Sequence, residues 1–131
     1  MIEKKAQAVL NALDCPDGEL SILIVDDQQI APLNKQYLNR EGPTNVIAFP
    51  MMEGEFSQVT PGLLGDVVIS LETARREADV SGVGTEQRFT ELLVHGILHL
   101  FGYDHVESES QAREMEAKST ELLEMLDRSA Y

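Results

Sequence analysis

The chain has 131 residues and a formal net charge of −13, from 23 acidic and 10 basic residues. This length suits one domain, and a hydrophobic content of 43% is enough for one core, so we expect residues 1–131 to form a single domain. No apolar run approaches the roughly 18 residues of a membrane helix, and the N-terminus lacks the apolar block of a signal peptide. The only cysteine, Cys15, excludes an internal disulfide and fits a reducing cytosol. The excess of acid repels polyanions at long range and argues against a broad nucleic-acid-binding surface.

The chain is predicted to begin with a helix, a strand and a second helix. Apolar residues at i, i+3, i+4 and i+7 predict a helix over residues 3–13. The short apolar run at 20–25 is typical of an interior strand. Asp26 and Asp27 favour the start of the second helix, in which Pro32 is expected to lie within the first turn.

Two further strands are expected in the middle of the chain. The segment 45–49 is the first of them, and residues 50–62 are predicted to form a surface loop. The second is 64–70, where Gly65 allows another backbone to approach closely. We expect these two strands to form a hairpin-like pair.

The rest of the chain is predicted to be helical. Ser70 is a suitable cap for a helix over 71–80, and Thr85 for a longer helix that Gly102 ends. A capping-box pattern at 108–111 predicts the start of a last helix. These elements predict an α/β (α+β) fold, a single domain in which a small mixed β-sheet of three to four strands is surrounded by about five helices.

All three histidines of the chain fall within the eleven residues HGILHLFGYDH. His95 and His99 are four residues apart on a predicted helix, so their imidazoles project from one face. Gly102 then ends the helix, and His105 can return as a third nitrogen ligand. Three imidazoles with an open fourth position describe a catalytic zinc site, whose bound water has a lowered pKa. We therefore predict one Zn2+ per chain, bound by His95, His99 and His105; the alternative is two packed histidines and an unrelated third.

The spacing H-x3-H-x2-G-x2-H is also that of the extended zinc signature of metzincin proteases. Those enzymes carry glutamate directly after the first histidine as the general base, and here that position is Gly96. Asp66, Glu91 and Asp104 are the acids that could replace it in space, but each is more simply a cap, a partner of a ligand or a solvated acid. The catalytic residues are therefore left unassigned.

The histidine block HGILHLFGYDH resembles the signature of the YbeY family, the single-strand-specific endoribonucleases of bacterial rRNA maturation. Met115 matches a methionine of the family's last helix. Further blocks match in the same order, so the resemblance covers roughly residues 20–126: LNKQY at 33–37, PTNVIAFP at 43–50 and LGDVVIS at 64–70.

The resemblance implies that His95, His99 and His105 are the zinc ligands. It implies a cytoplasmic, metal-dependent endoribonuclease that acts on single-stranded rRNA precursors in rRNA maturation and ribosome quality control. It also implies a mixed sheet surrounded by helices, the small ribosomal subunit or assembly factors as partners, and no membrane association. RNA binding by so acidic a chain needs a local basic groove or delivery by a partner. Five residues are candidates for that groove, although ordinary surface charge explains them equally well: Lys35, Arg40, Arg75, Arg76 and Arg88.

The chain departs from the family pattern at three places. Many members carry arginine directly after the tyrosine of the first block, where this chain has Leu38. Arg40 is either its replacement or a solvated loop cation. Helical spacing leaves the burial of Leu38 open, and we expect it to be exposed. The family's usual serine before Phe-Pro is Ala48, and many members begin with an additional β-strand that precedes the first helix.

Two other functions fit part of the pattern. One is a metallopeptidase-like zinc hydrolase, against which the missing glutamate after His95 counts. The other is a non-catalytic, zinc-containing ribosome-assembly factor, which Leu38 makes less remote. Zinc-assisted phosphodiester hydrolysis is the mechanism that the histidines favour, with either water or a ribose hydroxyl as the nucleophile.

Overall fold

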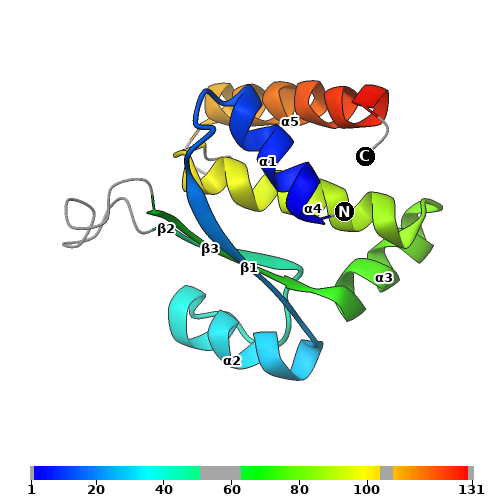
Figure 1. Ribbon diagram of the computed structural model, residues 1–131. Coiled ribbons are helices and arrows are strands. Elements are labelled where there is room, and N and C mark those ends of the chain that lie inside the picture. The colour runs from blue at the N-terminus through cyan, green and yellow to red at the C-terminus, as the bar shows by residue number, and fades with distance from the viewer. Residues whose placement is uncertain (1, 51–62, 104–107, 130–131) are drawn as a thin grey trace.

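The computed structural model describes residues 2–50, 63–103 and 108–129 (Figure 1). They form five helices and three strands in a single α+β domain, as the sequence predicted. In chain order the elements are α1 (Ile2–Ala12), β1 (Glu19–Val25), α2 (Asp27–Leu38), β2 (Val46–Pro50), β3 (Leu63–Ser70), α3 (Leu71–Ser81), α4 (Thr85–Leu100) and α5 (Glu109–Ser129). The surface loop predicted over 50–62 falls, beyond Pro50, outside the described residues.

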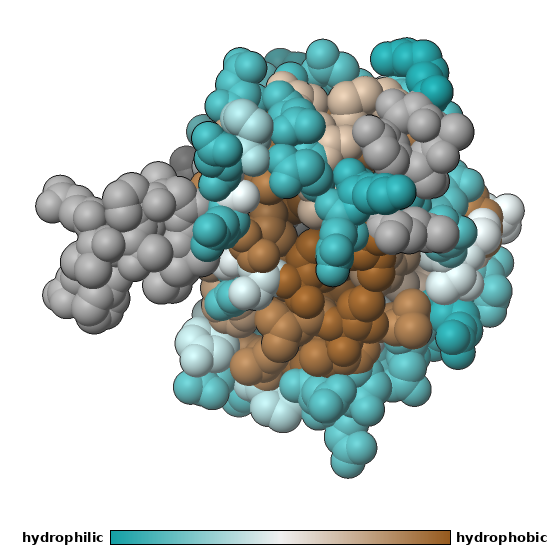
Figure 2. Space-filling model, in the orientation of Figure 1, coloured by the Kyte–Doolittle hydropathy of each residue, from teal (hydrophilic) through white to brown (hydrophobic). Residues whose placement is uncertain are grey.

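The three strands form one mixed sheet in the order β1-β3-β2. Strand β3 is central, parallel to β1 and antiparallel to β2, so the expected hairpin-like pair of β2 and β3 is confirmed. The interior position predicted for residues 20–25 is wrong, because β1 lies at an edge of this sheet. Leu23 and Ile24 are accordingly 45% and 47% exposed, and Figure 2 shows apolar surface between α1 and α2, where β1 runs. An apolar run alone does not distinguish a central strand from an edge strand.

Helices cover both faces of the sheet (Figure 1). Helices α1, α4 and α5 build the larger core on one face, and α2 covers the other face with a smaller core. Successive residues of a strand point to opposite faces, so Val67 belongs to the larger core and Val68 to the smaller one. Helix α4 packs directly on β2 and β3. This packing places the histidine-bearing helix beside the free edge of β2.

The start of α2 differs in one detail from the prediction. Asp26 caps the helix, since its carboxylate accepts a hydrogen bond from the Gln29 amide at 2.8 Å and the Gln29 side chain returns one to the Asp26 amide at 3.0 Å. Pro32 lies inside the helix, in its second turn, and not in the first turn as expected. The proline ring removes one helical N–H there, a cost that the buried Ile30 and the complete capping box help to offset.

The predicted helix boundaries in the second half are close to the observed ones. Ser70 caps α3 through a hydrogen bond from the Thr73 amide, and Gly82 ends that helix in the left-handed region, at φ 74°. Thr85 is not the cap of α4, because the helix begins at Thr85 itself and the cap position is held by Gly84, without a side-chain hydrogen bond. None of the helices in the described part of the chain is long and apolar enough to cross a membrane.

Candidate metal centre

His95 and His99 lie side by side on α4. Their Nε2 atoms are 3.0 Å apart, and the two ring centroids are 4.6 Å apart. Two nitrogen ligands of one tetrahedral zinc, each about 2.0–2.1 Å from the metal, are separated by roughly 3.3 Å. The pair therefore converges closely enough to bind one metal ion, and neutral imidazole is a donor that zinc favours.

The two histidines belong to a partly exposed row on an otherwise buried half of the helix. Between residues 91 and 100, three side chains are partly exposed, Glu91, His95 and His99, and all the others are buried. These three are spaced by four residues, so they form one polar row along α4. The neighbouring Leu98 and Ile97 are fully buried, and they fix the rotation of the helix that presents the histidines at its open face.

The third predicted ligand, His105, lies outside the described residues, as does Asp104. Among the described residues no cluster of three or more His, Cys, Asp or Glu side chains is placed to hold a metal. Glu91 is held by Arg88 in an ion pair of 2.9 Å, and Asp66 lies in β3, opposite Phe49 in the register of the sheet. Neither of these two acids lines the hollow that contains the histidines.

That hollow is a groove of about 460 Å³ along the edge of β2. It extends from the C-terminal end of α2 to α4, and it includes an element that sequence reasoning did not assign to the site, the β2 edge with the residues before it. The edge of β2 lies beside α4 because of tertiary packing, and no local sequence pattern predicts this. The lining residues are Leu38, Arg40, Thr44, Asn45, Val46, Ile47, Ala48, Pro50, His95, Gly96 and His99.

Among the described residues, no carboxylate lines the groove, although the chain has 23 acidic residues. Four other hollows in the described part of the chain are each lined by at least one acid. The only lysine or arginine in the groove lining is Arg40. A negatively charged ligand is therefore repelled less by the walls of this groove than by those of the other hollows.

Gly96, the residue that follows the first histidine, is buried between α4 and the sheet. A Cβ atom at this position would lie 2.6 Å from Val67 Cγ1 and 3.2 Å from Val46 Cγ2. The helix therefore packs closely on β2 and β3 because this residue has no side chain. A glutamate, the base that metzincin proteases carry here, does not fit without moving the helix.

The five basic residues proposed for a groove do not gather in one place. Lys35 pairs with Glu41 at 2.6 Å, Arg76 with Asp27 at 2.6 Å, and Arg88 with Glu77 and Glu91 at 2.9 Å. Arg75 is exposed on α3. Arg40 is the one member of this set that lines the histidine groove, and none of the ion pairs within the described residues involves it. The expected exposure of Leu38 is confirmed at 45%.

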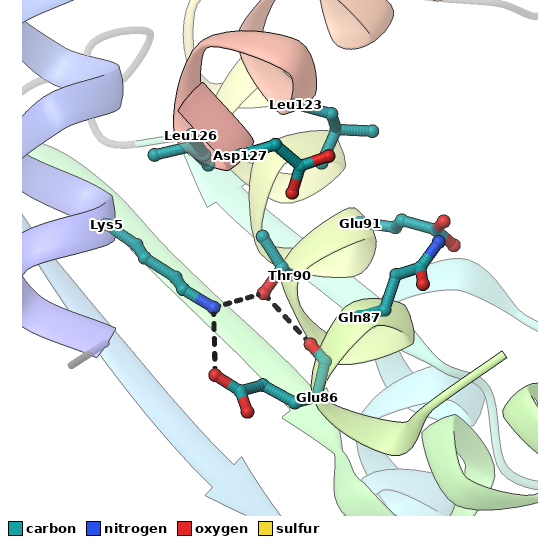
Figure 3. A pocket seen from close by; sticks show the side chains of 8 residues that line it. All are labelled: Lys5, Glu86, Gln87, Thr90, Glu91, Leu123, Leu126 and Asp127. Atoms are coloured by element: carbon teal, nitrogen blue, oxygen red, sulfur yellow. Dashed lines mark hydrogen bonds and ion pairs between the residues drawn. The ribbon is translucent and has the colours of Figure 1, made fainter. Parts of the chain in front are cut away.

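A second polar hollow, of about 380 Å³, lies between α1, α4 and α5 (Figure 3). The buried Lys5 ammonium there donates to Thr90 Oγ1 at 2.8 Å and pairs with Glu86 at 3.4 Å. The lining also includes Glu91 and Asp127. Three carboxylates against one already paired lysine make this hollow unsuited to phosphate, and we assign its polar contacts to helix packing.

Comparison with known proteins identifies relatives over nearly the whole chain. A sequence model of the family described as Endoribonuclease YbeY matches residues 1–127. The Endoribonuclease YbeY of Geobacter metallireducens is 50% identical over 128 residues, covering 97% of this chain and 85% of the relative. That of Syntrophotalea carbinolica is 53% identical over 122 residues, covering 92% and 81%. The solution structure of TM1509 from Thermotoga maritima superposes with a TM-score of 0.67 at 26% identity, over 94% of this chain and 77% of that one.

Proposed function

The chain belongs to the YbeY endoribonuclease family, and on that basis we propose that it is a zinc-dependent endoribonuclease specific for single-stranded RNA. We further propose that it acts in the cytoplasm, in rRNA maturation and ribosome quality control. Its substrate is then a single-stranded rRNA precursor, reached on the small ribosomal subunit or through assembly factors. These partners reconcile RNA cleavage with a net charge of −13, because the partner supplies the long-range attraction that the chain lacks.

One observation carries the proposal: the histidine pair opens into a groove whose described lining has no carboxylate. Non-specific attraction to RNA comes from cations beside the backbone, and a carboxylate at the same place would oppose each phosphate. The acidic side chains of the described residues are thus kept out of the groove that holds both histidines. This distribution supports a polyanionic substrate at that site.

His95 and His99 are the described residues that would hold zinc, and we propose His105 as the third ligand. A zinc ion bound there would polarise a phosphodiester oxygen, lower the pKa of a water molecule, or do both. The protein's own contribution is to present both Nε2 atoms at the groove, 3.0 Å apart. The buried face of α4 holds the histidines in place.

The same packing argues against the peptidase alternative. The position of the peptidase base is Gly96, and a Cβ atom there would point at the buried Val67 of β3, so a glutamate does not fit without moving the helix. Neither Glu91 nor Asp66 lines the groove that holds both histidines, although Glu91 and Glu116 line neighbouring hollows that His95 also borders. The nuclease proposal does not require a carboxylate at this position.

The test compares RNA cleavage by the unaltered protein and by His99→Ala, both purified without nickel resin because the site can exchange metals. We expect about one zinc per chain and cleavage of a single-stranded RNA, with both lost in His99→Ala. A copurified nuclease would give equal cleavage in the two preparations, and Arg75→Ala serves as the surface control. Cleavage of casein but not RNA would favour the peptidase. Zinc bound without any cleavage would favour a non-catalytic assembly factor.

A further inference from the structure

We propose that Arg40 binds a backbone phosphate of the RNA strand in the histidine groove and that the buried Asn34 positions it. The inference rests on the proposed function for the identity of the ligand. It does not rest on the metal, because neither residue is a predicted zinc ligand. Arg40 is the residue through which this acidic chain makes local electrostatic contact with its substrate.

The position of Arg40 follows from the way α2 ends. The helix stops at Leu38, and Asn39 adopts the left-handed conformation, at φ 55°. The chain therefore turns sharply, and Arg40 begins the loop that leads to β2. Arg40 and Leu38 line the groove together with His95 and His99, so Arg40 and the proposed metal ligands border the same space.

The charge of Arg40 is available to a ligand. Three of the other basic residues considered for a groove are neutralised by carboxylates at 2.6–2.9 Å. Arg40 takes part in no ion pair of the described residues, and none of the described acids lines its groove. A guanidinium presents several N–H donors in a planar fork that matches the oxygens of a phosphate. An unpaired guanidinium in a groove without carboxylates therefore favours a phosphodiester.

Asn34 holds the loop that carries Arg40 from both sides. Its side chain is 3% exposed, and its Nδ2 donates to the carbonyl of Gly42 at 2.9 Å. Its backbone carbonyl accepts from the amide of Arg40 at 3.3 Å. The Asn34 Oδ1 atom is buried and has no hydrogen-bond partner among the described residues, so the amide is retained at a cost to stability. We therefore assign to Asn34 the role of holding the loop from Arg40 to Gly42 in place through these two hydrogen bonds.

The test measures binding of a nuclease-resistant single strand, 2′-O-methyl RNA with phosphorothioate linkages, by fluorescence anisotropy over a range of salt concentrations. The full-length protein is used as purified. Arg40→Ala should weaken binding about tenfold at low salt and reduce the slope of log K against log salt by about 0.7, the value for one phosphate contact on a single strand. Arg40→Lys should keep the slope and recover part of the affinity. The matched control Arg75→Ala removes an exposed arginine outside the groove and should leave both unchanged.

Asn34 is tested through a double-variant cycle, with folding checked by circular dichroism. Asn34→Leu keeps the branched shape and the number of heavy atoms but removes the donor to Gly42, and it should weaken RNA binding several-fold. The same change should have no further effect in the Arg40→Ala background if Asn34 acts through Arg40. If Asn34→Leu does not fold, Asn34→Ser is used in the same cycle.

Three results would overturn the inference: an unchanged salt slope in Arg40→Ala, an equal loss in Arg75→Ala, or an undiminished effect of the Asn34 variant in the Arg40→Ala background. The first two remove the role of Arg40, and the third removes the role of Asn34. RNA that is bound through Arg40 but never cleaved would refute the proposed nuclease function and leave this inference standing.

Discussion

The contact between Gly96 and the sheet leads to a quantitative prediction about the site. In Gly96→Ala the new Cβ would lie 2.6 Å from Val67 Cγ1, too close for an undistorted contact. Overpacking of a core costs about 1–3 kcal/mol, and alanine recovers about 1 kcal/mol of helix propensity relative to glycine. We expect Gly96→Ala to lower the free energy of unfolding by about 1 kcal/mol. It should also lower RNA cleavage, because α4 moves away from β2 and carries the histidines with it.

A second variant tests whether Val67 is the cause. Val67 is fully buried, and Val67→Ala alone should cost about 2 kcal/mol in lost apolar burial and cavity formation. It also removes the methyl group that opposes the new Cβ. In that background Gly96→Ala should be neutral or stabilising, which corresponds to a favourable coupling of about 1–2 kcal/mol.

The matched control is Val68→Ala. Val68 is 4% exposed on the same strand, but its side chain belongs to the smaller core, on the opposite face of the sheet. Gly96→Ala and Val68→Ala should therefore be additive within about 0.5 kcal/mol. Urea denaturation of the three single variants and the two double variants gives both coupling energies, provided that the m-value is constant. Additivity of Gly96→Ala with Val67→Ala would refute the proposed contact.

Three further predictions concern pH and Leu38. The Ser70 and Thr73 hydroxyls and the Arg76 guanidinium lower the pKa of Asp27 from 3.8 to about 2, so this stabilisation is present above about pH 4 and is lost as the pH falls towards 2. Asp27→Asn should lower the free energy of unfolding by about 1–2 kcal/mol at neutral pH, a range that allows for screening of the partly exposed ion pair. Near pH 2 the same change should have little effect. A loss of thermal stability that is equal at both pH values would contradict this. Because ligating imidazoles must be neutral, zinc content and RNA cleavage should fall together below about pH 6.5, and cleavage that survives the loss of metal would be inconsistent with the mechanism. Leu38→Arg, at a position that is 45% exposed in the groove, should leave the thermal melt nearly unchanged and steepen the salt dependence of RNA binding by about 0.7; an unchanged slope would show that this position does not contact RNA.

The helices and the shared face of the two histidines were predictable because their causes are local. The Ser70 cap and the glycine that ends α3 act within one helical turn. The four-residue spacing of His95 and His99 places them on one face of any helix, whatever packs against it. The two errors, the helical turn that contains Pro32 and the cap residue of α4, are shifts of one turn or less.

The edge position of β1 and the composition of the groove were decided only by the tertiary structure. Strand order depends on pairing between residues far apart in the chain, so an apolar segment at 20–25 is equally compatible with the centre or the edge of a sheet. The pairing of the basic residues was also decided by the tertiary structure. The charge of a surface arginine is neutralised if another element places an acid beside it, and otherwise stays available to a ligand. Arg88 meets Glu77 of α3, whereas Arg40 borders a groove whose described lining has no carboxylate. Local hydrogen bonds and side-chain periodicity depend on residues that are close in the sequence. The electrostatic field at a site is instead the sum of charges that only the folded chain brings together.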